Sequence, residues 1–356
     1  MKTARRLPLR TFVLALAAIA ASTAGTWRTS AQTPSNAIFR LVTFEVNGDM
    51  RLGATAGDGE ADVLDVHNGI RWLIQSGAAE AQTLPYIPAD MRALIEAGPR
   101  AIAAVRQVYT TLAARKGSSG FKEPGGAHRV FHPPTAVRIL APVTNPSKIY
   151  GLAGNYPREG NLANPKYPSA FFKSLTSLAA PGDVIDLAGL VERGVHEPEM
   201  SFVIGRRAKN VPAAQAFDYI VGYTICNDVS ARGMEQGSHP TQGATFTKGL
   251  DTFSPCGPYL TLKEDVPDPH ALAIEARLNG TVSPMPNSNT RHLTFKIPQL
   301  VEYISRRMTL LPGDIIQTGV PAPVVPLRAG DTVEITIERL GTLRNRVAAN
   351  ASATQR

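Results

Sequence analysis

The sequence contains little cysteine and few aromatic side chains. Its two cysteines, Cys226 and Cys256, are too few for the disulfide framework of a small secreted domain. Because both stand in apolar surroundings, we expect them to be free, buried core residues, although an oxidising compartment would permit a bridge between them. Aromatic residues make up only 6% of the 356 residues, so the core must consist mainly of valine, leucine, isoleucine and alanine.

Several familiar catalytic motifs are also absent. The sequence has no Gly-x-Ser-x-Gly nucleophile elbow and no phosphate-binding loop that ends in Gly-Lys-Ser or Gly-Lys-Thr. The glycines of residues 151–154 lack the spacing of a dinucleotide fingerprint, and the histidines are too scattered to suggest a zinc site. These absences leave carboxylates and a hard divalent cation as the chemistry to consider.

Acidic residues are missing from the first 31 positions, which hold five of the 37 basic residues. The formal net charge is +8, and without that stretch 32 basic and 29 acidic residues leave +3. A body of mixed charge gives little support for nucleic-acid binding, so we expect no nucleic-acid partner. With 43% apolar and 19% charged residues, the composition is typical of a soluble globular protein with room for two domains.

The N-terminal stretch is typical of an export signal. A basic beginning precedes an uncharged apolar run at residues 12–21, which is shorter than the ~20 residues of a membrane-spanning helix. Small residues at 22–24 and 29–31 are candidate cleavage sites. We therefore predict a signal peptide at 1–31, no stable membrane span after its removal, and a periplasmic or secreted protein. An uncleaved anchor is the alternative, and the pair Arg5-Arg6 leaves a twin-arginine signal open.

The rest of the chain divides into two predicted domains. Residues 32–140 are predicted to form a small α+β domain, with strands in 38–66 around a turn at Asn47-Gly48-Asp49. Helices are expected there at 69–76, 89–96 and 101–116. Residues 141–350 are predicted to form a second domain rich in short strands, with one helix at 297–308. Its expected strands are 148–152, 199–204, 220–226, 259–261, 273–278, 315–317 and 332–337.

Three acidic residues stand beside apolar strands of the second domain. Glu197 and Glu199 are two positions apart at the start of a strand, so their side chains point to the same side. Two like charges on one face repel unless a cation neutralises them, although an exposed edge strand with two surface acids fits the same spacing. Asp228 follows another apolar strand. Together the three offer an all-oxygen ligand set suited to Mg²⁺, Mn²⁺ or Ca²⁺.

Motifs around these acids resemble the fumarylacetoacetate hydrolase family. The resemblance covers roughly residues 146–347 and is carried by the order of six pieces, of which the Glu-x-Glu and Asn-Asp-Val-Ser-Ala-Arg pieces are the most specific. The pieces are residues 148–156, 171–173 with 181–183, 197–205, 222–232, 248–258 and 311–319.

The resemblance implies a fold, a metal and a class of reaction. The family fold is an α+β mixed β-roll with flanking helices, commonly a homodimer. Members bind Mg²⁺ or Mn²⁺ and act on 2-oxo acids and 1,3-diketones. We therefore expect a metal-dependent hydrolase or lyase that cleaves a C–C bond in a small oxo-acid substrate through a metal-stabilised enolate. An isomerase or decarboxylase of a 2-oxo dicarboxylic acid in aromatic catabolism is one alternative. An exported metal- or ligand-binding protein without turnover is another.

The resemblance also assigns site residues. Glu197, Glu199 and Asp228 match the family's metal ligands, and Lys248 matches a lysine beside the metal. Lys173 and Arg232 match cationic positions around the substrate, whereas Tyr156 and Gly319 match positions that line the pocket.

Three departures from the family pattern affect the catalytic base and the substrate contacts. Where hydrolytic members often have a histidine paired with a glutamate, this chain has Glu159 and Leu162. Members often have a glutamine three residues after the arginine that Arg232 matches; here that position is Glu235, and the glutamine follows as Gln236. The usual Thr-Gly-Thr-Pro sequence is Thr-Gly-Val-Pro at residues 318–321, which lacks one hydroxyl group. We predict Lys248, Glu159 and Lys173 as catalytic residues and Gln236 as a further substrate contact. A solvated loop residue is the alternative for Glu159, and His239, then His196, would be its substitutes as proton donor.

Overall fold

The computed structural model describes residues 37–57, 61–157, 165–187, 191–234, 243–285, 288–321 and 323–348. The predicted signal peptide, Glu159, Gln236 and His239 lie outside these residues. The described residues belong to one compact unit. None of their helices is long and apolar enough to cross a membrane.

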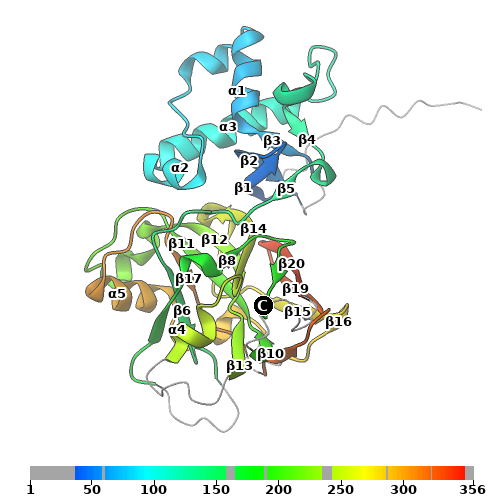
Figure 1. Cartoon of the computed structure of the whole chain (residues 1–356). Coiled ribbons are helices and arrows are strands. Elements are labelled where there is room, and N and C mark those ends of the chain that lie inside the picture. Colours follow the sequence, from blue (N-terminus) through cyan, green and yellow to red (C-terminus); the bar gives the residue numbers. More distant parts are fainter. Residues whose placement is uncertain are drawn as a thin grey trace, which may run out of the picture. The chain divides into compact units, whose positions relative to one another are not determined.

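Strands dominate the described part of the chain and form three sheets (Figure 1). The largest includes parallel pairs, such as β17 with β6, among mainly antiparallel ones, so the predicted mixed α+β fold is confirmed. Its path is β4 (Phe131–His132), β3 (Val63–Asp65), β2 (Asp49–Ala56), β1 (Phe39–Val46), β14 (Ser254–Leu262), β12 (Ile220–Asn227), β11 (Pro198–Ile204), β17 (Ile315–Gln317), β6 (Ile149–Ala153) and β7 (Ser169–Lys173), while β5 (Arg138–Ile139) joins β1 and β8 (Leu178–Ala179) joins β14.

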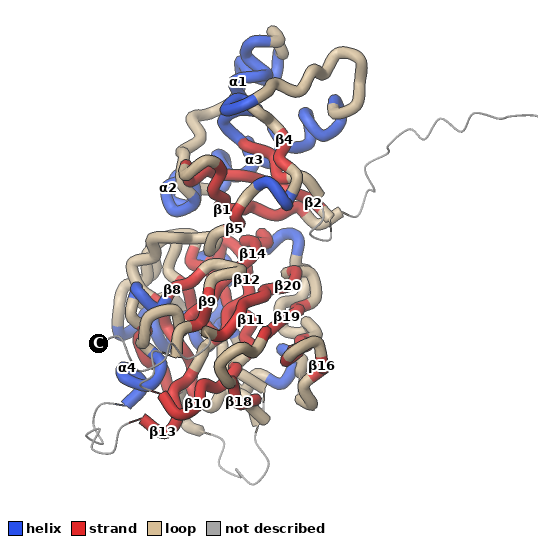
Figure 2. The backbone as a smooth tube through the Cα atoms, turned by 45° about the vertical axis from the view of Figure 1, so that its right-hand side comes forward, coloured by secondary structure: helices blue, strands red, loops and turns tan. Residues whose placement is uncertain are grey.

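Two smaller sheets complete the strand content of the described residues. Figure 2 shows β10 and β18 close together, in agreement with their antiparallel pairing. One sheet has the order β13 (Ser230–Met234), β10 (Val191–His196) and β18 (Val325–Leu327). The other has the order β16 (Thr281–Val282), β15 (Ile274–Leu278), β19 (Thr332–Ile337), β20 (Gly341–Val347) and β9 (Val184–Ile185).

The N-terminal elements follow the sequence signals closely. The predicted turn joins β1 to β2, and Asn47 and Gly48 adopt positive φ angles of 53° and 83°, as a tight hairpin requires. The three helices predicted before residue 117 are α1 (Val66–Gln75), α2 (Met91–Ala97) and α3 (Pro99–Arg115). The apolar face of α3 is buried in the same core as α1 and β1, which explains the periodic spacing of Ile102, Val105 and Val108.

A second core lies beneath the strands that will matter for the site. The helix α5 (Ile297–Arg307), close to its predicted range, buries Leu300 and Ile304 there, against residues of β11 and β12. The short helix α4 (Gly243–Lys248) buries no residue. The single sheet that contains β1 and β14 draws strands from both predicted domains, and the division at residue 140 stays a prediction.

The prediction that the two cysteines are free is wrong. Cys226 on β12 and Cys256 on β14 stand opposite each other in the strand register and form a disulfide. Both are fully buried, as expected. Their apolar sequence neighbours indicated burial, but only the pairing of two strands 30 residues apart brings the sulfur atoms together.

Candidate metal centre

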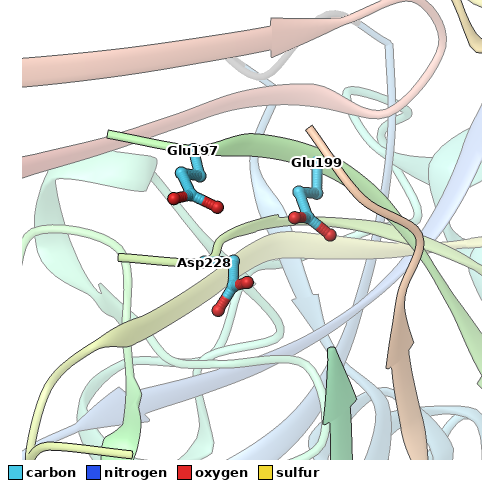
Figure 3. A group of neighbouring side chains, drawn as sticks. All are labelled: Glu197, Glu199 and Asp228. Carbon is cyan, nitrogen blue, oxygen red and sulfur yellow. The ribbon is translucent and has the colours of Figure 1, made fainter. Parts of the chain in front are cut away.

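Three strand ends bring the predicted carboxylates together (Figure 3). Glu197 lies at the junction of β10 and β11, Glu199 is on β11, and Asp228 directly follows β12. The antiparallel register pairs Pro198 with Asn227, so the acidic residues on either side meet. One oxygen of each carboxylate lies within 4.8 Å of the others, and all three residues are at most 5% exposed. The alternative of two surface acids on an edge strand is therefore wrong.

Neighbouring polar groups hold the carboxylates of Glu197 and Glu199 in place. The Ser230 hydroxyl donates a hydrogen bond to Glu197 Oε1 over 2.6 Å. The Gly319 backbone N–H donates to Glu199 Oε2, also over 2.6 Å. The remaining oxygen, Glu199 Oε1, is buried and has no hydrogen-bond partner among the described residues. Burying a carboxylate oxygen without a partner costs free energy, so this atom is a candidate to bind a ligand.

Two lysines flank the carboxylates. Lys248 Nζ, at the end of α4, lies 2.7 Å from Glu197 Oε2 and 2.6 Å from Asp228 Oδ2. Lys173, at the end of β7, is buried; its Nζ pairs with Asp228 Oδ1 and donates to the Phe253 carbonyl over 2.8 Å. Three carboxylates thus face two ammonium groups, which leaves excess negative charge when all are ionised.

The pKa shifts reflect burial and crowded charge. Burial raises the pKa of Glu199 well above its ordinary value, and the negative charge of Asp228 adds to this effect. Burial lowers the pKa of Lys173, partly offset by Asp228. Burial also acts to lower the pKa of Lys248, but Asp228 and Glu197 outweigh it, so that pKa is raised. The cluster would therefore gain from a further positive charge.

The cluster fits a divalent metal ion. Its donors are all carboxylate oxygens, the hard ligands preferred by Mg²⁺, Mn²⁺ and Ca²⁺. An ion there would satisfy Glu199 Oε1 and would offset the burial and the neighbouring negative charge that together raise the pKa of Glu199. Glu197, Glu199 and Asp228 are the residues that would hold it.

Two predicted pocket residues also lie beside Glu199. Tyr156 is 3% exposed, its hydroxyl has no hydrogen-bond partner in the described structure, and burial, followed by the charge of Glu199, raises its pKa. Gly319 has a φ of 100°, and a Cβ there would lie 2.8 Å from the Cβ of Asn155. Glycine is needed at this position, where the backbone comes close enough to donate to Glu199.

Other predicted residues are not gathered at the cluster by the described structure. Arg232 lies on β13, opposite Arg193 of β10, and only its backbone is described. Glu159, Gln236 and His239 fall outside the described residues. His196 is fully buried next to Glu197, and burial lowers its pKa to about 4, so the neutral ring dominates at neutral pH.

Sequence reasoning missed three supporting groups. The Ser230 hydroxyl and the Asn227 side chain, which accepts from Glu197 N–H over 2.9 Å, both hold Glu197. Both residues stand beside Asp228 in the Asn-Asp-Val-Ser-Ala-Arg motif, and this position could have identified them. The Phe253 carbonyl, which receives the Lys173 ammonium, had no side-chain signal at all.

Comparison with known proteins gives one consistent result. Residues 148–348 match the family model described as fumarylacetoacetate (FAA) hydrolase, C-terminal. A mitochondrial oxaloacetate tautomerase of Bos taurus is 36% identical over 74% of this chain and 81% of its own. The solved 2-hydroxyhepta-2,4-diene-1,7-dioate isomerase of Mycobacterium marinum is 31% identical, with a TM-score of 0.62 over 88% of this chain and all of its own. A maleylpyruvate hydrolase of Sphingobium sp. SYK-6, solved with manganese(II) and pyruvate, is 27% identical, with a TM-score of 0.64 over the same shares.

Proposed function

Because this chain belongs to the fumarylacetoacetate hydrolase family, we propose that it is a divalent-metal-dependent enzyme acting on a small 2-oxo acid. The observation that carries the proposal is the buried cluster of Glu197, Glu199 and Asp228, with the unsatisfied oxygen of Glu199 inside it. Lys173 and Lys248 offset only part of the buried negative charge and leave Glu199 Oε1 without a partner, so a purely structural role for the three acids is a poor explanation.

The reaction that we favour is proton transfer beside the ketone, which interconverts keto and enol forms. The similarity to an oxaloacetate tautomerase and to a dienedioate isomerase supports this choice. A bound divalent ion would polarise the ketone oxygen and stabilise negative charge on it. Cleavage of a C–C bond in a 1,3-diketo acid, expected first from the sequence, is the second candidate. The similarity to a maleylpyruvate hydrolase supports it.

The chain's own residues divide the work between binding and positioning. Lys248 carries a partly exposed cation of the site, with 13% of its side chain accessible, and its charge favours anionic substrate oxygens. Lys173 has no exposed side-chain surface, so it acts by fixing Asp228 rather than by meeting the substrate. Ser230 and the Gly319 N–H orient Glu197 and Glu199 in the same way.

Turnover on a matched panel of substrates tests the proposal. We expect purified protein with Mn²⁺ or Mg²⁺ to accelerate the enol–keto conversion of oxaloacetate, followed by ultraviolet absorbance, and to lose this activity with a chelator. An acylpyruvate series in the same metal, followed by release of pyruvate, tests the second candidate. Activity on the acylpyruvates alone would transfer the assignment to C–C hydrolysis. Activity on neither substrate class with either metal would contradict the proposal.

The variant Glu199→Gln provides the control within the panel. The amide keeps the size of the side chain and an acceptor for the Gly319 N–H, but removes one negative ligand. We expect it to fold and to lose the metal-dependent rate. If Glu199→Gln retains the full rate, the activity does not depend on this cluster.

A further inference from the structure

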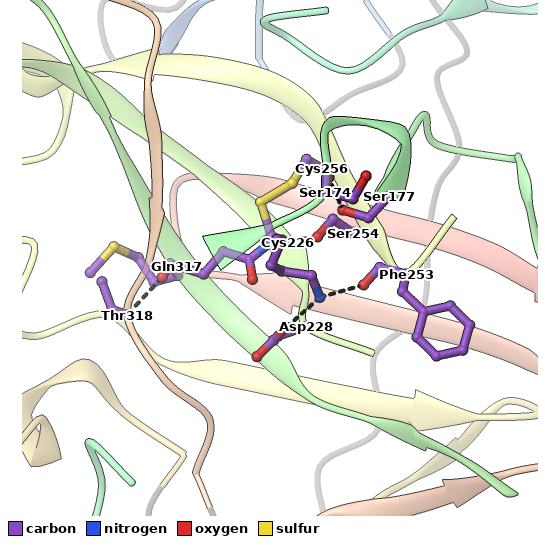
Figure 4. The surroundings of a disulfide bond; sticks show 11 residues. Ser174, Ser177, Cys226, Asp228, Phe253, Ser254, Cys256, Gln317 and Thr318 are labelled. Carbon is purple, nitrogen blue, oxygen red and sulfur yellow. Dashed lines mark hydrogen bonds and ion pairs between the residues drawn. A yellow bond between two sulfur atoms is a disulfide. The ribbon is translucent and has the colours of Figure 1, made fainter. Parts of the chain in front are cut away.

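We propose that the Cys226–Cys256 disulfide is a positioning element of the metal centre. The inference rests on the proposed function, because it assigns the disulfide a role in holding the carboxylates that would bind the ion. Figure 4 shows the disulfide close to Asp228, with Ser254 and Gln317 around it.

The disulfide lies at the end of the pairing between β12 and β14. The register of β12 with β14 runs to the pair Cys226 and Cys256, whose Cα atoms are 4.2 Å apart. Asp228 follows only two residues after Cys226. On its other side, β12 pairs Cys226 with Glu199 of β11. The cross-link therefore fixes the end of β12. Asp228 follows this strand end, and Glu199 lies opposite it on β11.

The loop closed by the disulfide carries several parts of the site. Its ends are 30 residues apart in the sequence. Between them lie Asp228, the Ser230 hydroxyl that orients Glu197, and the Lys248 ammonium that bridges Glu197 and Asp228. Lys248 stands at the end of α4, which has no buried residue to anchor it in the core.

The two ends of the loop also contact each other at the site. The Phe253 carbonyl, three residues before Cys256, accepts hydrogen bonds from Val229 N–H over 3.1 Å and from Lys173 Nζ over 2.8 Å. Lys173 in turn pairs with Asp228. A covalent link between Cys226 and Cys256 limits how far Phe253 and Asp228 can move apart, and so keeps Lys173 between them.

Closing a loop of this length removes conformational freedom that the free chain would have. A metal site gains affinity when its ligands and their supporting groups are already in place. The disulfide is fully buried, and disulfides persist in oxidising compartments, which agrees with the predicted export of the chain. Metal affinity, and not only stability, should therefore depend on the cross-link.

Calorimetric titration with Mn²⁺, well below the unfolding temperature, tests this role. We expect Cys226→Ala/Cys256→Ala to bind Mn²⁺ ~10–100-fold more weakly than the wild type, the usual effect of losing support around a metal ligand. Cys226→Val/Cys256→Ala, which restores apolar volume without a cross-link, should show the same loss. The control is Val63→Ala, which opens a cavity in the separate core of Val42, Phe44, Val63 and Tyr259 and should lower stability without changing affinity.

The outcomes separate the inference from the proposed function. A wild type that binds no Mn²⁺ contradicts the proposed function itself. A wild type that binds, with double variants of equal affinity and lower thermal stability, restricts the disulfide to a structural role and overturns the inference. Thiol titration of the unfolded, unreduced protein should find no free thiol, and two free thiols would overturn it as well.

Discussion

At the scale of single residues, the candidate centre is an arrangement of buried charges that compensate one another incompletely. Lys248 contributes most visibly, because its ammonium group lies within 2.7 Å of oxygens from two carboxylates. Removing one partner of a buried ion pair leaves the others uncompensated in a medium of low dielectric constant. A bound metal ion would neutralise the same carboxylates. Removing Lys248 should therefore increase the stability that the protein gains from binding the ion.

Replacing Lys248 by methionine should destabilise the metal-free protein in particular. We expect Lys248→Met to lower the free energy of unfolding in a chelator by up to about 3–5 kcal/mol. Mn²⁺ should then stabilise this variant more than it stabilises the wild type, as measured by urea unfolding with and without the ion. The matched control is Lys209→Met, at an exposed lysine. Equal stabilisation by Mn²⁺ in Lys248→Met and wild type would show that the ion and the lysine do not share these carboxylates.

Which residues of the centre were predictable depended on the kind of signal. Strand periodicity placed Glu197 and Glu199 on one face, but their proximity to Asp228 came only from the family resemblance. The register of β11 with β12, which creates that proximity, joins residues about 30 positions apart and leaves no local trace. The disulfide was missed for the same reason, since the pairing of β12 with β14 decides it.

At the scale of elements, a helix or turn with a clear local sequence signal was predicted well, whereas a strand that contains loop-forming residues was not. The Asn-Gly turn and the periodic helix α3 were predicted to within a few residues, because their signals lie in adjacent positions. The strand β14 is longer than expected, covering Ser254–Leu262 rather than 259–261. Its Ser-Pro-Cys-Gly-Pro beginning is typical of a loop. Gly257, with a φ of 134°, and a register shift against β12 allow the strand to contain these residues.

The helix α5 offers a pH-dependent prediction at this scale. His270 Nε2 accepts a hydrogen bond from the N–H of Ile297, the first residue of α5, over 3.2 Å. A protonated ring could not accept it. Burial, followed by the charge of Lys296, lowers the pKa of His270 below its ordinary 6.5. The unfolded chain therefore binds the proton more readily, and the stability from this group is present above pH 6.5 and lost as pH falls below it.

We expect the unfolding free energy of the wild type to fall between pH 7 and pH 5, and His270→Gln to reduce the fall. Glutamine retains an acceptor but does not titrate in this range. The buried histidines His132 and His196 are unchanged in both proteins, so the difference between the two curves isolates the half-buried His270. Parallel curves for the two proteins, measured by denaturant unfolding at each pH, would contradict this contribution.

At the scale of the whole molecule, the fold class was predictable and the sheet order was not. Alternating and apolar segments with one family's motifs indicated a mixed α+β fold. The order within the large sheet depends on pairs such as Arg40 with Thr261, far apart along the chain. Such long-range contacts depend on how the whole chain packs, and the sequence of a single segment does not predict them. Export and a homodimer stay predictions.

The central claim is that Glu197, Glu199 and Asp228 bind one divalent ion, and calorimetric titration of the intact protein with Mn²⁺ tests it most directly. We predict one site for each chain in the wild type, and an affinity at least ~10-fold lower in Glu199→Gln. Glu264→Gln, which removes an equal charge at an exposed position, should bind as the wild type does. Equal Mn²⁺ affinity in Glu199→Gln and wild type would contradict the account.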